Sequence, residues 1–462
     1  MNEQSPVAAA PRPFVRPIVS PPREKLLAAP ILPTLLRLTL PNTVAMSATA
    51  LAAVAETAYV GLLGVEPLAA MALAFPMIML MQMTSAGAMG GGVSSAIARA
   101  LGGGDIARAN ALALHAVVIA VCAGVFFTAF FWLLGPMIYQ VLGGRGETLG
   151  QAVLYSNTVF SGAIAVWLFN TLSSVLRGTG NMAVPSALGL VAAVFQIMIG
   201  GTLGLGLGPV PRLGMMGVAL GQVIAFSLGT LYLAWHLLAG RTRLRLSPGS
   251  FKAQGEMFAD ILKVGAMASL SSLQTVLTIL IFTGLVARFG TVALAGYGIG
   301  ARLEFLLIPI AFSVGVASVP MVGMAIGARD VARARRVAWT AGGLAFAALG
   351  VIGLLVILLP DAWSGLFTED AAVIAAARQY LIAAGAGFPF FGLGLCLYFA
   401  SQGAGRLVGP VLAGTLRLML VALGGWLLTA QAAPVWTLFA LAGSAMAIYG
   451  LATLAAVRFT RW

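Results

Sequence analysis

The chain has 462 residues, of which 60% are apolar and only 8% are charged. A typical soluble domain carries about 25% charged residues, so this composition excludes a soluble enzyme as well as a disordered or fibrous chain. What remains is a protein that crosses a membrane many times.

Residues 1–33 are rich in proline and carry scattered charges without a continuous apolar run. A secretory signal needs such a run, followed by a small-residue cleavage site. We therefore predict that residues 1–33 form a disordered cytoplasmic N-terminal tail.

Apolar stretches then follow one another between narrow clusters of charge. Because a helix needs about 20 apolar residues to cross a bilayer, we predict twelve transmembrane helices, at 34–60, 67–96, 110–135, 150–175, 184–207, 214–239, 258–287, 293–322, 337–359, 373–400, 408–430 and 434–457. The ten-residue alternating segments of a transmembrane β-barrel are not visible. The predicted fold class is an all-α polytopic membrane protein of two six-helix lobes, with an N-lobe at 34–239, a cytoplasmic linker at 240–257 and a C-lobe at 258–462.

The basic residues are distributed as the positive-inside rule describes. Most of the 26 Lys and Arg residues fall in the N-terminal tail and in every second connection, including 240–257. The other connections hold acidic residues such as Asp361 and Asp370. This pattern predicts that both termini are cytoplasmic, and it attributes the net charge of +13 to membrane topology and not to nucleic-acid binding.

The chain contains an internal repeat. Residues 100–109 (ALGGGDIARA) resemble residues 325–334 (AIGARDVARA), and each segment follows the second span of its half. The same offset pairs two glycines and a proline after the fourth span of each half, namely Gly178, Gly180 and Pro185 with Gly403, Gly405 and Pro410. Because six spans is an even number, the halves are parallel repeats. Such repeats form a cavity at their interface that alternately opens to each side, although a channel can also be built from repeats.

Ionisable residues within a membrane cost about 2.5–3.5 kcal/mol on insertion scales, so each needs an explanation. Glu56 lies in the first expected span, whereas its counterpart in the second half is Ile281 or Phe282. Because one half alone carries this carboxyl group, we predict that it binds a proton or a sodium ion. A hydrated position near the membrane surface is the alternative.

Glu304 lies two residues after Arg302 in the eighth span. Side chains at this spacing do not face each other on a straight helix. Two hypotheses remain open: Glu304 forms an ion pair or lies at the rim, or it projects into the cavity and attracts a cationic substrate. The histidines and cysteines show no metal-ligand spacing, and no arrangement of side chains suggests catalysis, so we expect neither an enzyme nor a cofactor.

Four sequence features resemble the multidrug and toxic compound extrusion (MATE) transporters, and among them the DNA-damage-inducible-protein-F-like branch. These features are Pro41 with Glu56-Thr-Ala-Tyr-Val-Gly61, the paired Gly-x-x-Asp-x-x-Arg-Ala loops, Arg177-Gly-Thr-Gly-Asn181, and Ala301-Arg-Leu-Glu304. The resemblance covers about residues 34–457. It implies a two-lobed antiporter of the bacterial inner membrane, monomeric, which exports cationic or amphiphilic small molecules by alternating access.

The resemblance also implies roles for particular residues. The family usually has Asp where this chain has Glu56, and Gln196, Gln222 and Asn170 would join it in a cation-coupling site, while span 1 would bend at Pro41. A second carboxylate that the branch often carries in span 5 is missing. Because a dehydrated sodium ion favours several hard oxygen ligands and more than one negative charge, we favour proton coupling, with sodium coupling as an alternative.

For the substrate cavity between the lobes we expect five residues: Glu304, Arg302, Gln82, Gln274 and Tyr59. A flippase for a lipid-linked intermediate is the second alternative for the function. A flippase that moves anionic head groups should line its cavity with several Arg or Lys residues. The spans of this chain offer few, Arg302 and Arg417.

Overall fold

The computed structural model describes residues 23–244, 246, 249 and 251–462, so the first 22 residues of the expected tail lie outside the described part. Every described element is a helix. Among the described residues, eleven helices are long and apolar enough to cross a membrane, or twelve when one bent pair is counted as a single span. The predicted all-α fold class is confirmed, with eleven or twelve spans where we predicted twelve.

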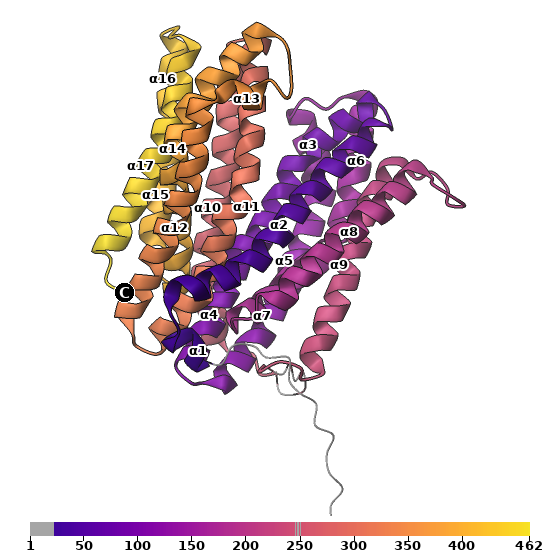
Figure 1. Ribbon diagram of the computed structural model, residues 1–462. Coiled ribbons are helices and arrows are strands. Elements are labelled where there is room, and N and C mark those ends of the chain that lie inside the picture. Colours follow the sequence, from indigo (N-terminus) through magenta and orange to yellow (C-terminus); the bar gives the residue numbers. More distant parts are fainter. Residues whose placement is uncertain (1–22, 245, 247–248, 250) are drawn as a thin grey trace, which may run out of the picture.

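The first half of the molecule, called here the N-half, runs from α1 to α9 (Figure 1). Its elements are α1 Arg23–Ala28, α2 Ile31–Gly61, α3 Val65–Gln82, η1 Met83–Met89, α4 Gly90–Gly102, α5 Ile106–Val141, α6 Gly146–Ser161, α7 Ala163–Gly178, α8 Ala183–Leu205 and α9 Gly214–Leu238.

The second half, called here the C-half, runs from α10 to α17 and lies beside the first (Figure 1). Its elements are α10 Gly255–Ala287, α11 Thr291–Gly327, α12 Val331–Leu358, α13 Pro360–Ser364, α14 Ala371–Ala404, α15 Val408–Met419, η3 Leu420–Gly424, α16 Gly425–Ala430 and α17 Val435–Phe459.

Two spans of the N-half are irregular. The second span runs from α3 through the π-helical turn η1 into α4. The fourth span consists of α6 and α7, which are bent by 46° at Gly162. A Cβ atom at Gly162 would lie 2.6 Å from a methyl group of Val223 on α9. Glycine at the bend therefore allows the fourth span to pack closely against α9.

The repeated sequence motifs mark helix ends that recur in both halves. Asp105 caps α5, because its Oδ1 accepts a hydrogen bond of 2.8 Å from the backbone N–H of Arg108. Asp330 caps α12 through a bond of the same length from the N–H of Arg333. Such a cap satisfies a backbone donor that the helix itself leaves free. The motif thus fixes where the third span of each half begins.

The paired glycines of the repeat also have a structural reason. Gly180 has a backbone φ of 86° and Gly405 has a φ of 72°. Both angles lie in the left-handed region, where residues with a Cβ atom are disfavoured. Glycine therefore ends the fourth span of each half at an equivalent position.

Part of the expected N-terminal tail is ordered, which corrects our expectation for residues 23–33. Residues 23–28 form α1, and α2 already begins at Ile31. Leu26 is 1% exposed, and the guanidinium of Arg333 donates hydrogen bonds to the carbonyl oxygens of Leu26 at 2.8 Å and Ala29 at 2.6 Å. These contacts tie the segment to α12, at the end of the bundle where the C-terminus also lies (Figure 1).

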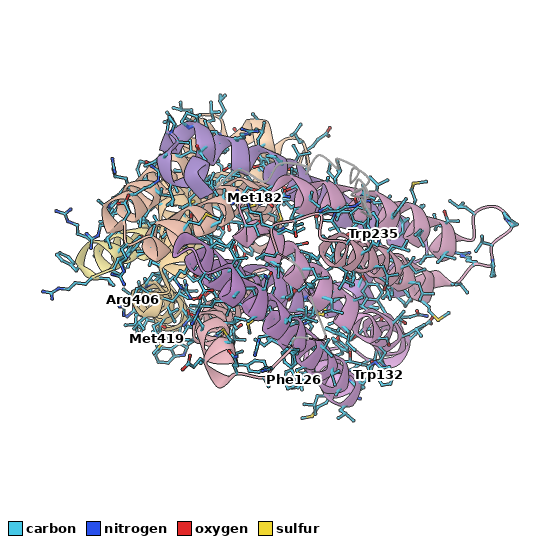
Figure 2. All side chains as sticks on the ribbon, turned by 90° about the horizontal axis from the view of Figure 1, so that it is seen from below. Phe126, Trp132, Met182, Trp235, Arg406 and Met419 are labelled. Carbon is cyan, nitrogen blue, oxygen red and sulfur yellow. The ribbon has the colours of Figure 1, made fainter. Side chains whose placement is uncertain are left out.

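Large apolar side chains cover the outside of the bundle. On α5, Phe126 is 60% exposed and Trp132 is 53% exposed. Both lie at the periphery when the molecule is viewed from below (Figure 2). Exposed apolar side chains of this size are expected where a helix faces lipid.

The two halves are joined mainly at the end of the bundle that holds α4. Ser95 Oγ donates a hydrogen bond of 2.6 Å to the carbonyl oxygen of Gln402, and Gln402 Nε2 donates one of 3.0 Å to the carbonyl oxygen of Ala88. The backbones also approach closely, since a Cβ atom at Gly102 would lie 2.2 Å from the carbonyl oxygen of Met324. This end of the interface is closed.

Candidate functional site

Glu56 lies near the C-terminal end of α2 and is buried, with 5% of its surface exposed. Helix α2 carries it against α8, where Gln196 Nε2 donates a hydrogen bond of 2.7 Å to Glu56 Oε1. Tyr59 lies one turn further along α2 and is also buried, and its hydroxyl has no hydrogen-bond partner among the described residues. Glu56, Gln196 and Tyr59 therefore form a polar site enclosed by apolar helices.

Gln222 is buried on α9, which packs tightly against α8. The approach is close because both helices carry glycine there: a Cβ atom at Gly221 would lie 2.9 Å from the carbonyl oxygen of Gln196 and 2.5 Å from the Cα of Gly200. Gln222 is the residue directly after Gly221, which packs against Gln196. Gln196 donates a hydrogen bond to Glu56. Among the hydrogen bonds of the described residues, none joins Gln222 to Glu56.

Asn170 hydrogen bonds to a different group from the one we expected. Its Nδ2 donates to Ser85 Oγ at 2.8 Å and to Gln82 Oε1 at 3.3 Å. Asn170 thereby links α7 to the second span. Gln82, which we expected in the substrate cavity, belongs to this same link.

Pro41 lies inside α2, whose helix continues through it. A proline within a helix removes one backbone hydrogen bond and favours a kink. The next residue, Asn42, is buried and donates a hydrogen bond of 3.2 Å to Ser313 Oγ on α11. The segment in which we expect span 1 to bend is therefore tied to the opposite half.

Arg302 and Glu304 do not form an ion pair with each other among the residues that the structure describes. The guanidinium of Arg302 lies 5.2 Å from the ring centre of Phe367 and is exposed. The carboxylate of Glu304 accepts a hydrogen bond from the hydroxyl of Tyr380 on α14. Neither residue lines the cavity between the halves.

A cavity of about 110 Å³ lies against the inner face of the C-half. Its wall consists mostly of α10, α11, α14, α15 and α17, and Met83 and Gly87 of η1 close it from the N-half. Of the five residues that we expected here, Gln274 lines the cavity. Gln274 Nε2 donates a hydrogen bond of 2.8 Å to Thr415 Oγ1.

Sequence reasoning did not assign Arg417 or the aromatic wall to the cavity. Arg417 lines it together with five aromatic residues, Phe312, Phe391, Tyr398, Phe399 and Tyr449. A cation in the apolar stretch 408–430 was the visible signal for Arg417. The aromatic residues gave no such signal, because phenylalanine occurs throughout the spans.

The arrangement suits binding and proton exchange. Protonation of Glu56 would remove its charge and turn one carboxyl oxygen into a hydrogen-bond donor, which changes the bond to Gln196. A metal centre is not indicated by the described residues, where no three His, Cys, Asp or Glu side chains gather in a way that could hold an ion.

A duplicated helical bundle with a cavity between its halves and a buried carboxyl group is typical of a multi-pass membrane transporter. The MatE family model matches residues 41–201 and again residues 268–427, once in each half. The chain therefore belongs to the MATE family, whose members are transporters and not enzymes.

Similar proteins of known type support the assignment to this family. The chain is 24% identical to an FAD transporter of Shewanella oneidensis over 68% of its own length and 69% of the relative. It is 27% identical to the multidrug export protein MepA of Staphylococcus saprophyticus, over 77% of its own length and 79% of the relative. The fold is similar to that of a MOP superfamily transporter from Pyrococcus furiosus, described for the reverse polarity of its binding pocket, with a TM-score of 0.88, 22% identity and coverage of 95% and 98% of the two chains.

Proposed function

We propose that this transporter is a secondary active antiporter that exports amphiphilic small molecules by alternating access and is driven by proton influx. The observation that carries the proposal is the buried pair of Glu56 and Gln196, present in one half of a duplicated molecule. A gradient-driven carrier needs a group that binds the driving ion away from bulk water, and Glu56 meets that need. Multidrug exporters among the relatives support small-molecule export.

The proposed cycle begins with substrate in the cavity on the C-half. In this cycle, the state in which the α4 end is closed exposes the cavity to the opposite side of the membrane. A proton that enters from that side binds Glu56 and alters its hydrogen bond to Gln196. Linkage requires that the proton weaken substrate binding by the same factor by which substrate weakens proton binding.

A proton fits the Glu56 site better than a sodium ion does. Sodium, like other hard cations, is held by several oxygen ligands. The described hydrogen bond to Glu56 comes from the amide N–H of Gln196, so this arrangement pairs the carboxylate with a donor and not with a second oxygen ligand. Sodium coupling remains the alternative.

A flippase for a lipid-linked intermediate is the second candidate. Several Arg or Lys side chains would be needed to hold an anionic head group with its phosphates. Among the described residues that line the cavity, Arg417 is the one basic side chain. This supports a smaller substrate.

We further propose that the transporter works as a monomer in a bacterial plasma membrane with both termini in the cytoplasm. Positive charge at the α1 and C-terminal end supports this orientation. The assignment to the DNA-damage-inducible-protein-F-like branch remains a prediction.

Transport by the purified protein in liposomes tests the proposal. A pH gradient or a sodium gradient is imposed in separate runs, and the movement of a cationic dye, ethidium, and of an anionic dye, carboxyfluorescein, is followed. We expect transport of at least one dye that depends on the pH gradient and is lost in Glu56→Gln.

Glu304→Gln is the matched control, because it removes the carboxylate of a partly buried glutamate that lies outside the cavity. It should retain the response to the pH gradient. Full pH-driven transport by Glu56→Gln would refute the coupling site. Transport driven by the sodium gradient would show that the coupling ion is sodium and not the proton. Failure of both dyes to move under either gradient would contradict the export function.

A further inference from the structure

The charge of the cavity differs from the one that a carrier of cations needs. Arg417 projects from α15 into the cavity wall. None of the described lining residues is Asp or Glu. A cation that entered this cavity would meet a positive charge and no carboxylate, which is unfavourable in a low-dielectric environment.

Arg417 is held in place by aromatic rings and not by an acidic partner. Its guanidinium carbon lies 5.2 Å from the ring centre of Phe391 and 5.9 Å from that of Tyr449. Stacking of this kind leaves the N–H groups at the edge of the guanidinium free to donate hydrogen bonds. A planar array of such donors matches a carboxylate or a phosphate group.

Glu304 on α11 is an acidic residue of the same half as Arg417. No ion pair joins the two among the described residues, and the carboxylate of Glu304 accepts its hydrogen bond from Tyr380. Glu304 also lies outside the cavity wall. The N–H donors of Arg417 therefore remain available to a ligand in the cavity.

The remaining wall is of two kinds. Phe312, Phe391 and Phe399 offer flat apolar surfaces, whereas α10 contributes a polar face with Ser272, Gln274 and Thr275. Aromatic walls favour an aromatic or apolar body, and a few placed polar groups fix its orientation. The aromatic surfaces, the polar face of α10 and the positive charge of Arg417 together define the class of ligand that fits this cavity.

We propose that this cavity binds amphiphilic organic anions, that is, compounds with an aromatic or apolar body and at least one carboxylate or phosphate group, and that Arg417 recognises an anionic group. The inference rests on the proposed export function and specifies the substrate class for it. It replaces the cationic substrate that we expected from the family resemblance.

Binding to the purified full-length protein in nanodiscs of zwitterionic lipid tests this inference without requiring transport. The probes are carboxyfluorescein and ethidium, two aromatic dyes of opposite charge, followed by fluorescence anisotropy. We expect carboxyfluorescein to bind more tightly than ethidium. Arg417→Gln should weaken carboxyfluorescein binding by about ten- to hundredfold, the usual effect of losing a charged hydrogen-bonding partner, and should leave ethidium binding no weaker.

Two further variants keep the test specific. Arg417→Lys retains the charge without the planar donors and should recover part of the affinity. Arg302→Gln removes an equal charge from the same half, outside the cavity, and should change nothing. Competition by phenyl phosphate or by benzoate then shows which anionic group is preferred.

Tighter binding of ethidium than of carboxyfluorescein, or equal effects of Arg417→Gln and Arg302→Gln, would overturn the inference. Because the readout is binding, this failure is separate from failure of the export function. Gradient-driven transport of ethidium alone would likewise preserve the antiporter and refute the anionic substrate.

Discussion

Asp260 offers a direct way to perturb the closed end of the interface. Its carboxylate, at the start of α10, binds Arg99 Nη2 at 2.6 Å and Arg108 Nη2 at 3.1 Å. Both arginines belong to the N-half, so one carboxylate bridges the halves. Asp260→Asn keeps the side-chain size but removes the charge from both pairs. We expect this variant to shift the molecule toward states in which the α4 end is open.

The magnitude follows from the exposure of the three side chains. Their exposed fractions are 25% for Asp260, 18% for Arg99 and 37% for Arg108, so solvent screens both pairs. Exposed ion pairs contribute about 0.2–1 kcal/mol each. Two pairs should together stabilise the closed end by about 0.4–2 kcal/mol, which changes the ratio of closed to open states by roughly two- to thirtyfold.

Spin-label distance measurements on the protein in nanodiscs can detect this change. Labels at Ile106→Cys and Arg406→Cys report on the two halves at the closed end, with the native cysteines Cys122 and Cys396 replaced by serine. Asp260→Asn should increase the population of longer distances. Asp361→Asn, which breaks an ion pair to Arg378 within the C-half, is the control and should leave the distribution unchanged. Equal distributions in the wild type and Asp260→Asn would refute the role of the bridge.

Two further predictions concern other contacts. Arg333→Ala removes the donors to the carbonyl groups of Leu26 and Ala29, so amide hydrogen exchange across 26–30 should become several times faster, while exchange in α14 stays unchanged. Gly443→Ala places a Cβ atom 2.0 Å from the carbonyl oxygen of Ala383 and should destabilise the fold by about 1–3 kcal/mol. Thermal unfolding measures this loss, and Gly284→Ala, which meets nothing within 4 Å, should melt like the wild type.

The number of spans and the duplication could be predicted from the sequence because both depend on long patterns. A span needs about 20 apolar residues, and a stretch of that length is visible without knowledge of the tertiary fold. The repeat was visible because Asp105 and Asp330 cap equivalent helices and because Gly180 and Gly405 hold equivalent positive φ angles. Local constraints of this kind preserve sequence in both halves.

Which polar residues meet could be predicted only in part. Glu56 and Gln196 come together, whereas Asn170 binds Ser85 and Gln82 in another part of the N-half. Each of these residues is an isolated polar group in an apolar helix, and the sequence does not say which way a helix is turned. Packing through glycines such as Gly221 decides the rotation.

The composition of the cavity was the least predictable feature. Arg417 is one cation in an otherwise apolar span, and its position over the rings of Phe391 and Tyr449 depends on three different helices. Long-range side-chain contacts of this kind leave no periodic trace in a single sequence. The expectation of Arg302 and Glu304 in the cavity came from their charge alone.

Proton release upon substrate binding tests the central claim most directly. Purified protein in weakly buffered detergent solution is mixed with a substrate identified in the liposome assay, and a pH indicator records the protons released. The account predicts that the wild type and Glu304→Gln release protons, and that Glu56→Gln binds the same substrate without release. Undiminished proton release by Glu56→Gln would contradict the assignment of Glu56 as the coupling site.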